Sequence, residues 1–484
     1  MNTYLLEFYV VGLGVIMLLW EAFASPKNKS QLALIGASGL TVILALLIMG
    51  SYCPACKEVP SWLSRFYSTS GHAIFFKGFA LISTILVLIM TYDFRGILNK
   101  FTSNDDSDTH TGEFYTLPIF ACAGLMWMAS ATDLVSIFVA LELVTITFYV
   151  MVAYMRRNVG SLEAGVKYLI LGALSTGFLV YGIAWLYGAV GTTDLTKIAE
   201  IMSPSNTEYD VNQYALLFGL SMIILALGFK VGAVPMQLWI PDVYQGAPNP
   251  ITAFLSIASK AAGFGVAIVI LQPFLESEAA GSNVTMILTV MAVATLIYGN
   301  LSALTQTNFK RLLAYSSIAH AGFLLLALAT SDYQAVKFYL ATYLVMNFAG
   351  FYILNLVRIQ DESDEIDAFD GLGKRNPRLG AALTITMAAM AGVPLTAGFM
   401  GKFLVIKSIS GVLPWPVLVV AFIAAASGFY YYFKIIRAIY WHKPAKDAPL
   451  LIPMSSKIVI SVLTVATIII GVYPKAIECI IGCH

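Results

Sequence analysis

The chain has 484 residues, of which 59% are hydrophobic and only 11% are charged, and its formal net charge at pH 7 is +1. A soluble domain carries about 25% charged residues, so this composition excludes an ordinary soluble protein and predicts an all-α polytopic membrane protein. The small net charge and the lack of a basic tail give no reason to expect nucleic acid as a partner.

Continuous apolar runs, each long enough to cross a bilayer as a helix, recur along the whole chain. A β-barrel is excluded because its strands would alternate apolar and polar residues over segments of about 10 residues. The first run lacks the basic start and the cleavage site of a signal peptide, so we expect it to remain as a span. The sequence predicts about fourteen spans, near residues 4–22, 30–50, 72–92, 115–131, 134–155, 162–188, 214–247, 250–274, 283–304, 313–330, 334–357, 379–411, 416–440 and 456–473.

The basic residues are divided unequally between the two sides of the membrane. With fourteen spans both termini share one side, and the loops of that side hold only Lys57, Arg65, Lys197 and Lys475. Most of the other basic loop residues fall on the opposite side. Because basic loops stay in the cytoplasm, we expect both termini on the periplasmic, outer side.

The loops contain no nucleotide-binding pattern, neither GxGxxG nor GxxxxGK[ST]. The longest of them, 93–114, 192–213 and 358–378, are polar and are predicted to be solvated connectors. We therefore expect no nicotinamide, flavin, iron–sulfur cluster or metal in this chain.

Four of the five cysteines are predicted to lie on the outer side, where disulfides are stable: Cys53, Cys56, Cys479 and Cys483. A metal site that also uses the terminal histidine is the alternative. The terminal CxxxCH run differs from the CxxCH of haem attachment, so haem is not expected. Cys122 lies inside a span and is predicted to be a small buried apolar residue.

We single out six ionisable residues inside predicted spans, where an ionised side chain costs about 2.5–3.5 kcal/mol on insertion scales. A desolvated lysine near a carboxylate can exchange between neutral and protonated forms, whereas selective binding of sodium or potassium would favour clustered carboxylates. The set therefore indicates a proton relay. Its members are Glu142, Lys167, Lys230, Lys260, His320 and Lys402.

Structural roles remain open for several of these residues. Lys167 could pair with Glu163 one turn earlier, Glu142 could hold helices together, and His320 could be a satisfied core residue. At the end of one span, Lys310 and Arg311 are at least as suited to anchoring as to function. Asp133, in a short turn between spans, is predicted to cap a helix.

Two predicted spans are interrupted, by GFKVGAVPMQLWIPDVYQGAP at 228–248 and by AGVPLTAGFMGKF at 391–403. Proline inside a helix costs about 3 kcal/mol, and the freed backbone groups need partners within the membrane. Paired breaks predict an inverted-repeat transporter with ion sites at the breaks. We expect peripheral spans in 1–110, two inverted five-helix repeats in 111–275 and 276–445, and a last span in 446–484.

Three segments closely resemble the antiporter-like membrane subunits of proton-pumping NADH:quinone oxidoreductase, respiratory complex I. They are LGFKVGAVPMQLWIPDVYQGAPNPITAFLSIASK at 227–260, GNLSALTQTNFKRLLAYSSIAHAGFLL at 299–325 and AGVPLTAGFMGKF at 391–403. The similarity runs through most of spans 4 to 14. Among the three related subunits, the N type is the most similar, because of the DVYQGAP wording, the lysine at 402 and the length of fourteen spans.

The resemblance implies a proton-translocating subunit in the bacterial cytoplasmic membrane, with the bilayer and other membrane subunits as partners, including further antiporter-like ones. The chain would be part of a translocating enzyme but hold no redox centre, since NADH, FMN, iron–sulfur clusters and quinone would bind partner subunits. By the same resemblance, Glu142 is the essential membrane glutamate and Lys167 its partner lysine. The resemblance also gives relay roles to Lys230, Lys260, His320 and Lys402.

One residue departs from the family pattern, because Gln237 stands where the family commonly has histidine. Glutamine does not titrate, so a relay role at this place would pass to water or to a neighbour. Two other functions remain open: a subunit of an Mrp-type cation/proton antiporter, or the equivalent subunit of a hydrogenase or ferredoxin-linked relative of complex I. The buried ionisable residues argue against a passive scaffold.

Overall fold

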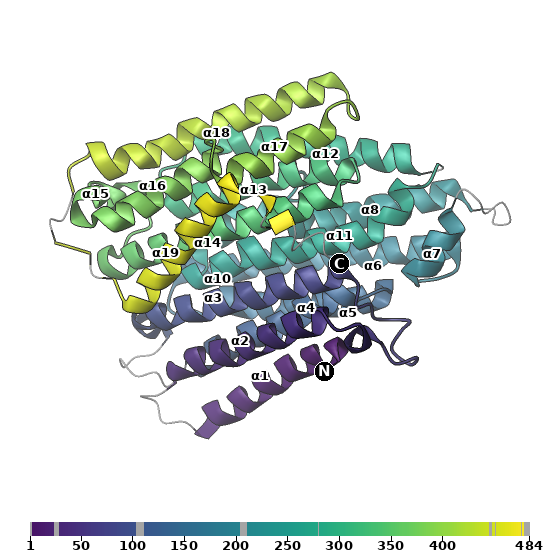
Figure 1. Ribbon diagram of the computed structural model, residues 1–484, viewed down its shortest axis with the longest axis horizontal. Helices are drawn as coiled ribbons and strands as arrows, with labels where there is room; N and C mark the ends of the chain where they lie inside the picture. The colour runs from purple at the N-terminus through teal and green to yellow at the C-terminus, as the bar shows by residue number, and fades with distance from the viewer. Residues whose placement is uncertain are drawn as a thin grey trace.

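The computed structural model describes residues 2–23, 29–102, 111–203, 211–278, 280–444, 448–450, 452–475 and 477–478, and these residues form helices and connecting turns without a named strand. Figure 1 shows that the long helices run side by side, with α1 and α2 at one edge of the bundle and α18 at the other. The first nine α-helices are α1 (Leu6–Phe23), α2 (Gln31–Ser51), α3 (Gly71–Thr102), α4 (Gly112–Ser130), α5 (Leu134–Val152), α6 (Val159–Val190), α7 (Leu195–Met202), α8 (Gln213–Val231) and α9 (Trp239–Gly246).

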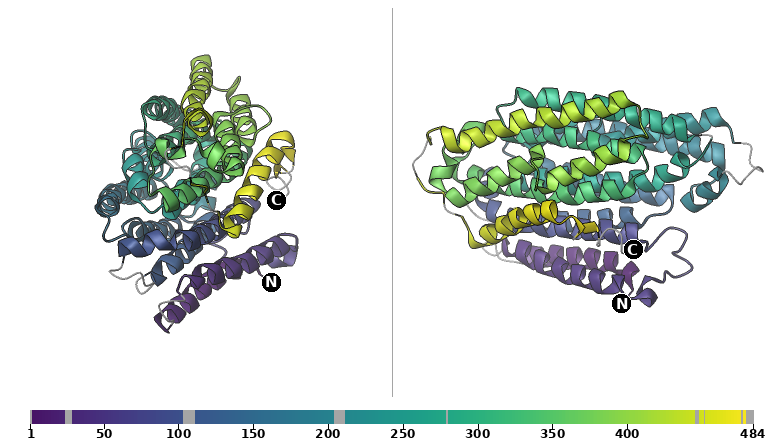
Figure 2. Two further views of the ribbon diagram at one scale, coloured as in Figure 1. Left: turned by 90° about the vertical axis from the view of Figure 1, so that its left-hand side faces the viewer. Right: turned by 45° about the horizontal axis from the view of Figure 1, so that its top comes forward.

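The second part of the chain begins with α10 (Asn249–Phe254), which continues through a π-helical turn (Leu255–Ser259) into α11. Figure 2 shows the bundle end-on in its left view and tilted in its right view, and in both the helices pack in more than one layer. The remaining helices are α11 (Lys260–Leu275), α12 (Gly281–Leu304), α13 (Phe309–Ala329), α14 (Tyr333–Asp361), α15 (Leu372–Arg375), α16 (Pro377–Ala391), α17 (Ala397–Ile409), α18 (Trp415–Trp441) and α19 (Met454–Val472).

Twelve helices in the described part of the chain are long and apolar enough to cross a membrane, which confirms the all-α polytopic class. The other two predicted spans coincide with α4 and with the pair α16–α17. The members of that pair have 15 and 13 residues and are too short to cross singly. The number fourteen and the inverted repeats stay predictions, as do the domain limits.

The three loops predicted to be solvated connectors contain helix, so that prediction is wrong in part. Helix α3 continues about ten residues beyond the predicted span, because Phe94, Ile97 and Leu98 form a buried face at helical spacing. The short helix α7 forms at one end of the bundle, opposite α15, and buries one apolar stripe (Figure 1). Asp133 accepts a hydrogen bond from the Val135 N–H at the start of α5, which confirms the predicted cap.

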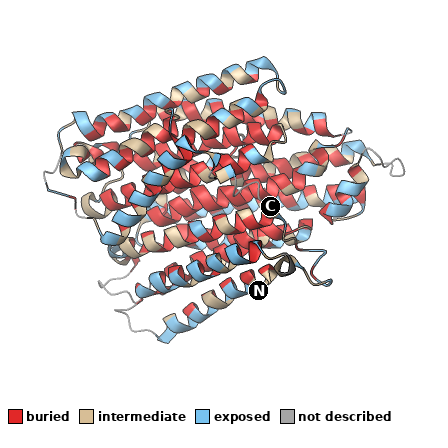
Figure 3. Ribbon diagram, viewed as in Figure 1, coloured by how far each residue is buried: buried red, intermediate tan, exposed pale blue. Residues whose placement is uncertain are grey.

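Burial is greatest in the middle of the bundle and falls towards its edges (Figure 3). Every residue of α13 except Arg311 is buried, whereas α1, α6 and α18 expose many large apolar side chains. Exposed apolar faces of this kind are expected on helices that meet lipid or a neighbouring subunit. The interior therefore lies around α13, and polar groups found there need partners inside the protein.

The peripheral helices hold a buried ion pair that the sequence did not lead us to expect. The Lys77 ammonium on α3 lies 2.9 Å from a Glu7 carboxylate oxygen on α1, and both side chains are almost completely buried. The Tyr67 hydroxyl donates to both Glu7 oxygens, at 2.8 and 2.9 Å. This contact fastens α1 to α3 through groups whose unpaired burial would be costly.

We predict that Lys77→Met lowers the unfolding midpoint of the detergent-solubilised protein substantially. The variant leaves the Glu7 carboxylate buried without its cation, a change worth about 3–5 kcal/mol. The double variant Glu7→Gln/Lys77→Met removes both charges and should recover much of the midpoint. Lys100→Met on the same helix is the matched control, since its ion pair with Glu362 is exposed. Equal losses in Lys77→Met and Lys100→Met would contradict the prediction.

Candidate functional site

The two predicted breaks have the same local structure. Helix α8 ends at Gly232 with φ 81° and α16 ends at Gly392 with φ 93°, a left-handed conformation that glycine adopts without penalty. Pro235 and Pro394 follow within three residues and prevent either helix from continuing. Each break therefore exposes the last carbonyl groups of a helix inside the bundle.

One lysine lies at the carboxyl end of each first half-helix. Lys230 is in the last turn of α8. Lys402 belongs to the second half-helix, α17, but its ammonium reaches back and donates to the carbonyl oxygens of Met390 and Ala391, each at 2.9 Å. Because helix carboxyl ends carry partial negative charge, both positions suit a cation. Lysine precedes proline in the first break and follows it in the second, yet in both breaks the lysine ammonium lies at the carboxyl end of the first half-helix.

Gly392 is needed for this approach of Lys402 to α16. A Cβ atom at Gly392 would lie 3.2 Å from Cδ of Lys402, which is tighter than usual contact, and 3.4 Å from its Nζ. The same glycine provides the left-handed turn that ends α16. Backbone conformation and access for the lysine therefore depend on one residue.

Glu142 and Lys230 share a neighbourhood between α5, α6 and α8. The Lys230 ammonium donates to the hydroxyl of Thr145, which lies one turn after Glu142 on α5. The charge of Glu142 acts on Lys230 across this turn. Glu142 itself accepts a 2.8 Å hydrogen bond from Thr176 and lines a largely apolar groove of about 610 Å³ between α5 and α6.

The pairing of Glu142 with Lys167, implied by the resemblance, is not formed in this structure. The Lys167 ammonium lies 2.7 Å from Glu163 and 2.8 Å from Asp242, and its side chain is 42% exposed. The residue of α6 that contacts Glu142 is Thr176, about 13 Å further along the helix axis than Lys167. The structural alternative, a pair with Glu163, therefore occurs, and Lys230 takes the place beside Glu142.

Lys167 belongs instead to a charged vestibule of about 400 Å³. Its walls come from segments far apart in sequence, and they include Glu163, Lys167, Asp242, Lys310, Arg311, Arg358 and Asp364. Asp242 bridges the vestibule, since its carboxylate lies 2.8 Å from Lys167 and 2.8 Å from Arg311. Our reading of the sequence left Asp242 without a role, although its position in IPDVYQGAP between two apolar segments was a usable signal.

Lys310 and Arg311 were predicted to serve as anchors or caps as readily as in function. The structure places both in the vestibule wall. Lys310 is 3% exposed, and its ammonium donates at 2.7 Å to the carbonyl of Ala247, near the end of the first break segment. A buried ammonium so close to the vestibule is a candidate proton carrier between it and the interior.

Lys260 lies at the centre of the bundle, directly after the π-helical turn. It is 2% exposed and donates to both the carbonyl and the hydroxyl oxygen of Ser317 on α13. Its ammonium also lies 5.4 Å from the centre of the Tyr343 ring. Single π-helical turns are frequent at functional sites, and this one directly precedes Lys260, whose ammonium contacts α13.

His320 is held on α13 by two tyrosine hydroxyls. Nδ1 lies 2.7 Å from the Tyr339 hydroxyl and Nε2 lies 3.2 Å from the Tyr432 hydroxyl, which also contacts Ser316. Hydroxyl groups either donate or accept, so both ring nitrogens keep a partner when the histidine gains or loses a proton. The satisfied core residue and the proton carrier are therefore compatible here.

Helix α13 connects the central lysine to the terminal one. Ser317 accepts a hydrogen bond from Lys260. Phe323 lies on the same helix as Ser317, and the centre of its ring is 5.7 Å from the Lys402 ammonium. His320 lies between these two positions. Among the described residues, no carboxylate forms an ion pair with Lys230, Lys260 or Lys402. The acceptors are hydroxyl and carbonyl oxygens, which leave the lysines free to exchange protons.

Gln237 lies in the first break and is 4% exposed. Its Oε1 atom has no hydrogen-bond partner within the described structure. Cys122 is fully buried in α4, as predicted, and no disulfide joins Cys53 to Cys56. The predicted outer cysteines Cys479 and Cys483, with the terminal His484, lie outside the described residues.

Comparison with known proteins fits this geometry. The chain matches the family described as "NADH:quinone oxidoreductase/Mrp antiporter, TM" over residues 131–428. It is 39% identical over 471 residues to NADH-quinone oxidoreductase subunit N of Heliobacterium modesticaldum, covering 96% of this chain and 93% of the relative. The chain belongs to this family of membrane subunits.

Other members of the NADH:quinone oxidoreductase/Mrp antiporter family agree with this assignment. NADH-quinone oxidoreductase subunit N 2 of Chloroherpeton thalassium is 32% identical over 487 residues, with 98% of this chain and 92% of the relative covered. A chain of respiratory complex I from Thermus thermophilus superposes with a TM-score of 0.80 at 28% identity, covering 98% of both chains. A chain of the archaeal membrane-bound sulfane sulfur reductase gives 0.86 at 27% identity, covering 99% of this chain and 96% of that one. The predicted resemblance is confirmed.

We predict that Asp242→Asn impairs turnover of the assembled complex more than Glu163→Gln does. Both residues pair with Lys167, but Asp242 also pairs with Arg311, so only its loss leaves two cations facing each other across the vestibule. The measurement is the rate of quinone reduction coupled to proton uptake in membrane vesicles. Equal rates in the two variants would show that the bridge is not needed.

Proposed function

We propose that this chain is a proton-translocating membrane subunit of an NADH:quinone oxidoreductase of the complex I type. The observation that carries the proposal is the set of buried lysines whose acceptors are hydroxyl and carbonyl oxygens, joined through α13 and bounded by a carboxylate at Glu142. Electron transfer takes place in partner subunits, which hold NADH, FMN, the iron–sulfur clusters and quinone.

The proposed mechanism is electrostatic. Glu142 stabilises a protonated Lys230, and a neighbouring membrane subunit seated on the groove beside Glu142 changes that attraction during quinone reduction. When the attraction weakens, the proton moves inward along the axis. Lys167 lines the vestibule, through which protons enter from the cytoplasmic side.

The proton then passes along α13. Lys260 receives it beside Ser317, and His320 with its two tyrosine hydroxyls links Lys260 to Lys402. At Lys402 the carbonyl ends of α16 hold the cation until it is released to the outer side. Each step moves one proton between neighbouring groups, and no electron passes through this chain.

Replacement of Lys230 or Glu142 by alanine tests the relay directly. We expect the complex to assemble and pumping-coupled quinone reduction to fall at least about tenfold, because a positioned proton carrier contributes that much or more. The matched control is Lys197→Ala on the exposed face of α7. Proton uptake by vesicles and quinone reduction are measured together, and full activity in both variants would refute the relay.

The orientation proposed for the chain places both termini and α7 on the outer side, with α15 in the cytoplasm. In a variant lacking Cys53, Cys56, Cys479 and Cys483, a cysteine at the exposed position Ser64 should react with a membrane-impermeant maleimide in intact cells. A cysteine at Lys374, exposed at the opposite end, should react only after permeabilisation. The reverse labelling pattern would show that the orientation is inverted.

A second candidate is the equivalent subunit of a ferredoxin-linked or hydrogenase relative of complex I, or of an Mrp-type antiporter. The similarity to a chain of the archaeal sulfane sulfur reductase favours it, because that complex shares the fold at comparable identity. The subunits that co-purify with this chain decide between the candidates. A flavoprotein that oxidises NADH supports the proposed function, and its absence from an intact complex supports the relative.

A further inference from the structure

Two basic groups at the outer end of the bundle have no part in the relay described above. Lys337 lies in the second turn of α14 and is 8% exposed, yet it makes no hydrogen bond or ion pair with any residue that the structure describes. His72 lies in the first turn of α3, and its Nε2–H donates to the carbonyl of Gly265 on α11 at 3.2 Å. Helices α3 and α14 both begin at this end of the bundle and run in parallel, so His72 and Lys337 lie at the same level.

Neither group stabilises the helix that carries it. Both lie near helix amino ends, whose partial positive charge repels a cation. Both also lie at the proposed outer side, where basic residues are otherwise few. A lysine at a membrane surface normally extends its ammonium into water, but Lys337 is too buried to do so. Their placement therefore calls for a role that needs weakly held protons near the outer surface.

The pair lies on a line that leads to Lys260. Helices α3 and α14 run side by side, since the Tyr352 hydroxyl donates to the Leu86 carbonyl and Asn355 to the Met90 carbonyl. Along α14, Lys337 is about 9 Å from Tyr343, whose ring contacts the Lys260 ammonium. Helix α11 completes the line, because it begins at Lys260 and passes His72.

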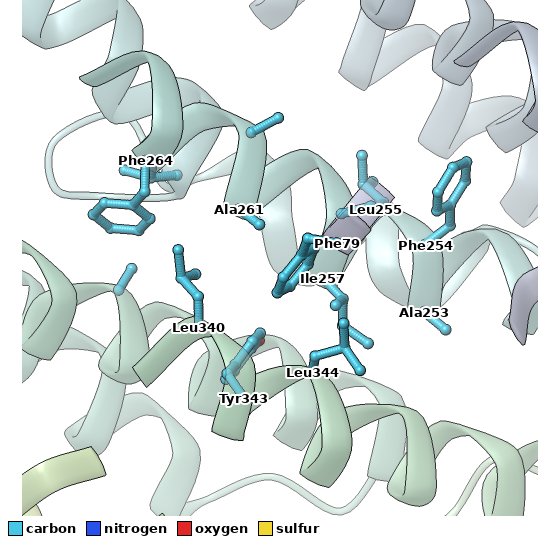
Figure 4. Close-up of a cluster of buried hydrophobic side chains, with 14 of the residues drawn as sticks. Phe79, Ala253, Phe254, Leu255, Ile257, Ala261, Phe264, Leu340, Tyr343 and Leu344 are labelled. Atoms are coloured by element: carbon cyan, nitrogen blue, oxygen red, sulfur yellow. The ribbon is translucent and has the colours of Figure 1, made fainter. Parts of the chain in front are cut away.

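An apolar layer separates the two ends of this line. Figure 4 shows Phe79 of α3, Phe264 of α11 and Leu340 of α14 among the apolar side chains that fill the space between α11 and α14. The three side chains are between 0% and 5% exposed. Apolar constrictions of this kind close a water path by drying and open it with small side-chain movements.

We propose that His72 and Lys337 form a second outlet, through which a proton leaves the central axis directly from Lys260 when this apolar layer becomes hydrated. The Lys260 ammonium gives up one proton and becomes an amine, and Nδ1 of His72 receives that proton through water before it passes to the outer solution. No electrons move in this step. Lys337 is a positioning residue: when its amine is protonated, its charge repels a proton on the imidazole. The inference rests on the proposed function.

The test uses the whole complex reconstituted in proteoliposomes, with proton transport and quinone reduction measured together. The variants are His72→Ala and Lys337→Met, and Lys407→Met at the exposed outer end of α17 is the matched control. We expect assembly in all three and a partial loss of proton transport in the first two, because a positioned proton acceptor is lost while the outlet at Lys402 still operates. Imidazole added to the outer solution should restore transport in His72→Ala.

Each outcome assigns a cause. If the unmodified complex and Lys407→Met do not transport protons, the proposed function is wrong. If they do, and His72→Ala and Lys337→Met transport protons as fast as the unmodified complex, the outlet is overturned. Slow transport in His72→Ala that imidazole does not restore would show a structural role and also overturn it. If His72→Ala fails to assemble, Leu340→Ser provides the test. A raised passive proton leak in Leu340→Ser that is suppressed in the double variant Leu340→Ser/His72→Phe supports the outlet. An unchanged leak in Leu340→Ser overturns it.

Discussion

The contact between Lys260 and Ser317 is the interaction on which the central site depends. It joins a fully buried ammonium to a helix that is itself buried along nearly all its length, so neither partner can reach water without opening the bundle. An unpaired ammonium there would be expensive, which fixes the aim of Lys260 and the register of α13 together. The same register then presents His320 and Phe323 to the second half of the molecule. The proposed proton carrier and a structural contact between helices are thus the same group.

The breaks in α8 and α16 solve a related problem. A lysine in an unbroken apolar helix finds no acceptor in the backbone of its own helix, since those carbonyls are used within the helix. Glycine and proline end the helix early and release carbonyl groups at the depth where a cation is wanted. Lys402 uses those carbonyls directly, whereas Lys230 stays on the ending helix and finds Thr145 and the charge of Glu142. The helix ends thus supply negative potential without a carboxylate, which would hold the proton more tightly.

The class of fold, the paired breaks and the buried lysines were predictable because hydropathy, glycine–proline punctuation and intramembrane charge are local properties of the sequence. The partners of those lysines were not. Lys167 and Glu142 lie on neighbouring helices, but only the depth of each along its helix decides whether they meet, and the sequence does not give that depth. Asp242 and the Glu7–Lys77 pair were missed for the same reason, since their contacts join segments about 70 residues apart. Loop helices such as α7 were underestimated because polar composition hid a short buried stripe.

The buried basic groups discussed above lie near different helix ends, and this difference matches the roles that we propose for them. Lys230 and Lys402 lie at helix carboxyl ends, which attract a cation and suit stations where a proton waits. His72 and Lys337 lie near helix amino ends, which repel a cation and suit a place that a proton leaves. Lys260 lies between the two kinds, held by neutral oxygens alone. In the proposed outlet, a proton that moves from Lys260 towards His72 therefore goes to a place of higher electrostatic energy. Quinone reduction must drive this step, and it takes place only when the apolar layer is hydrated.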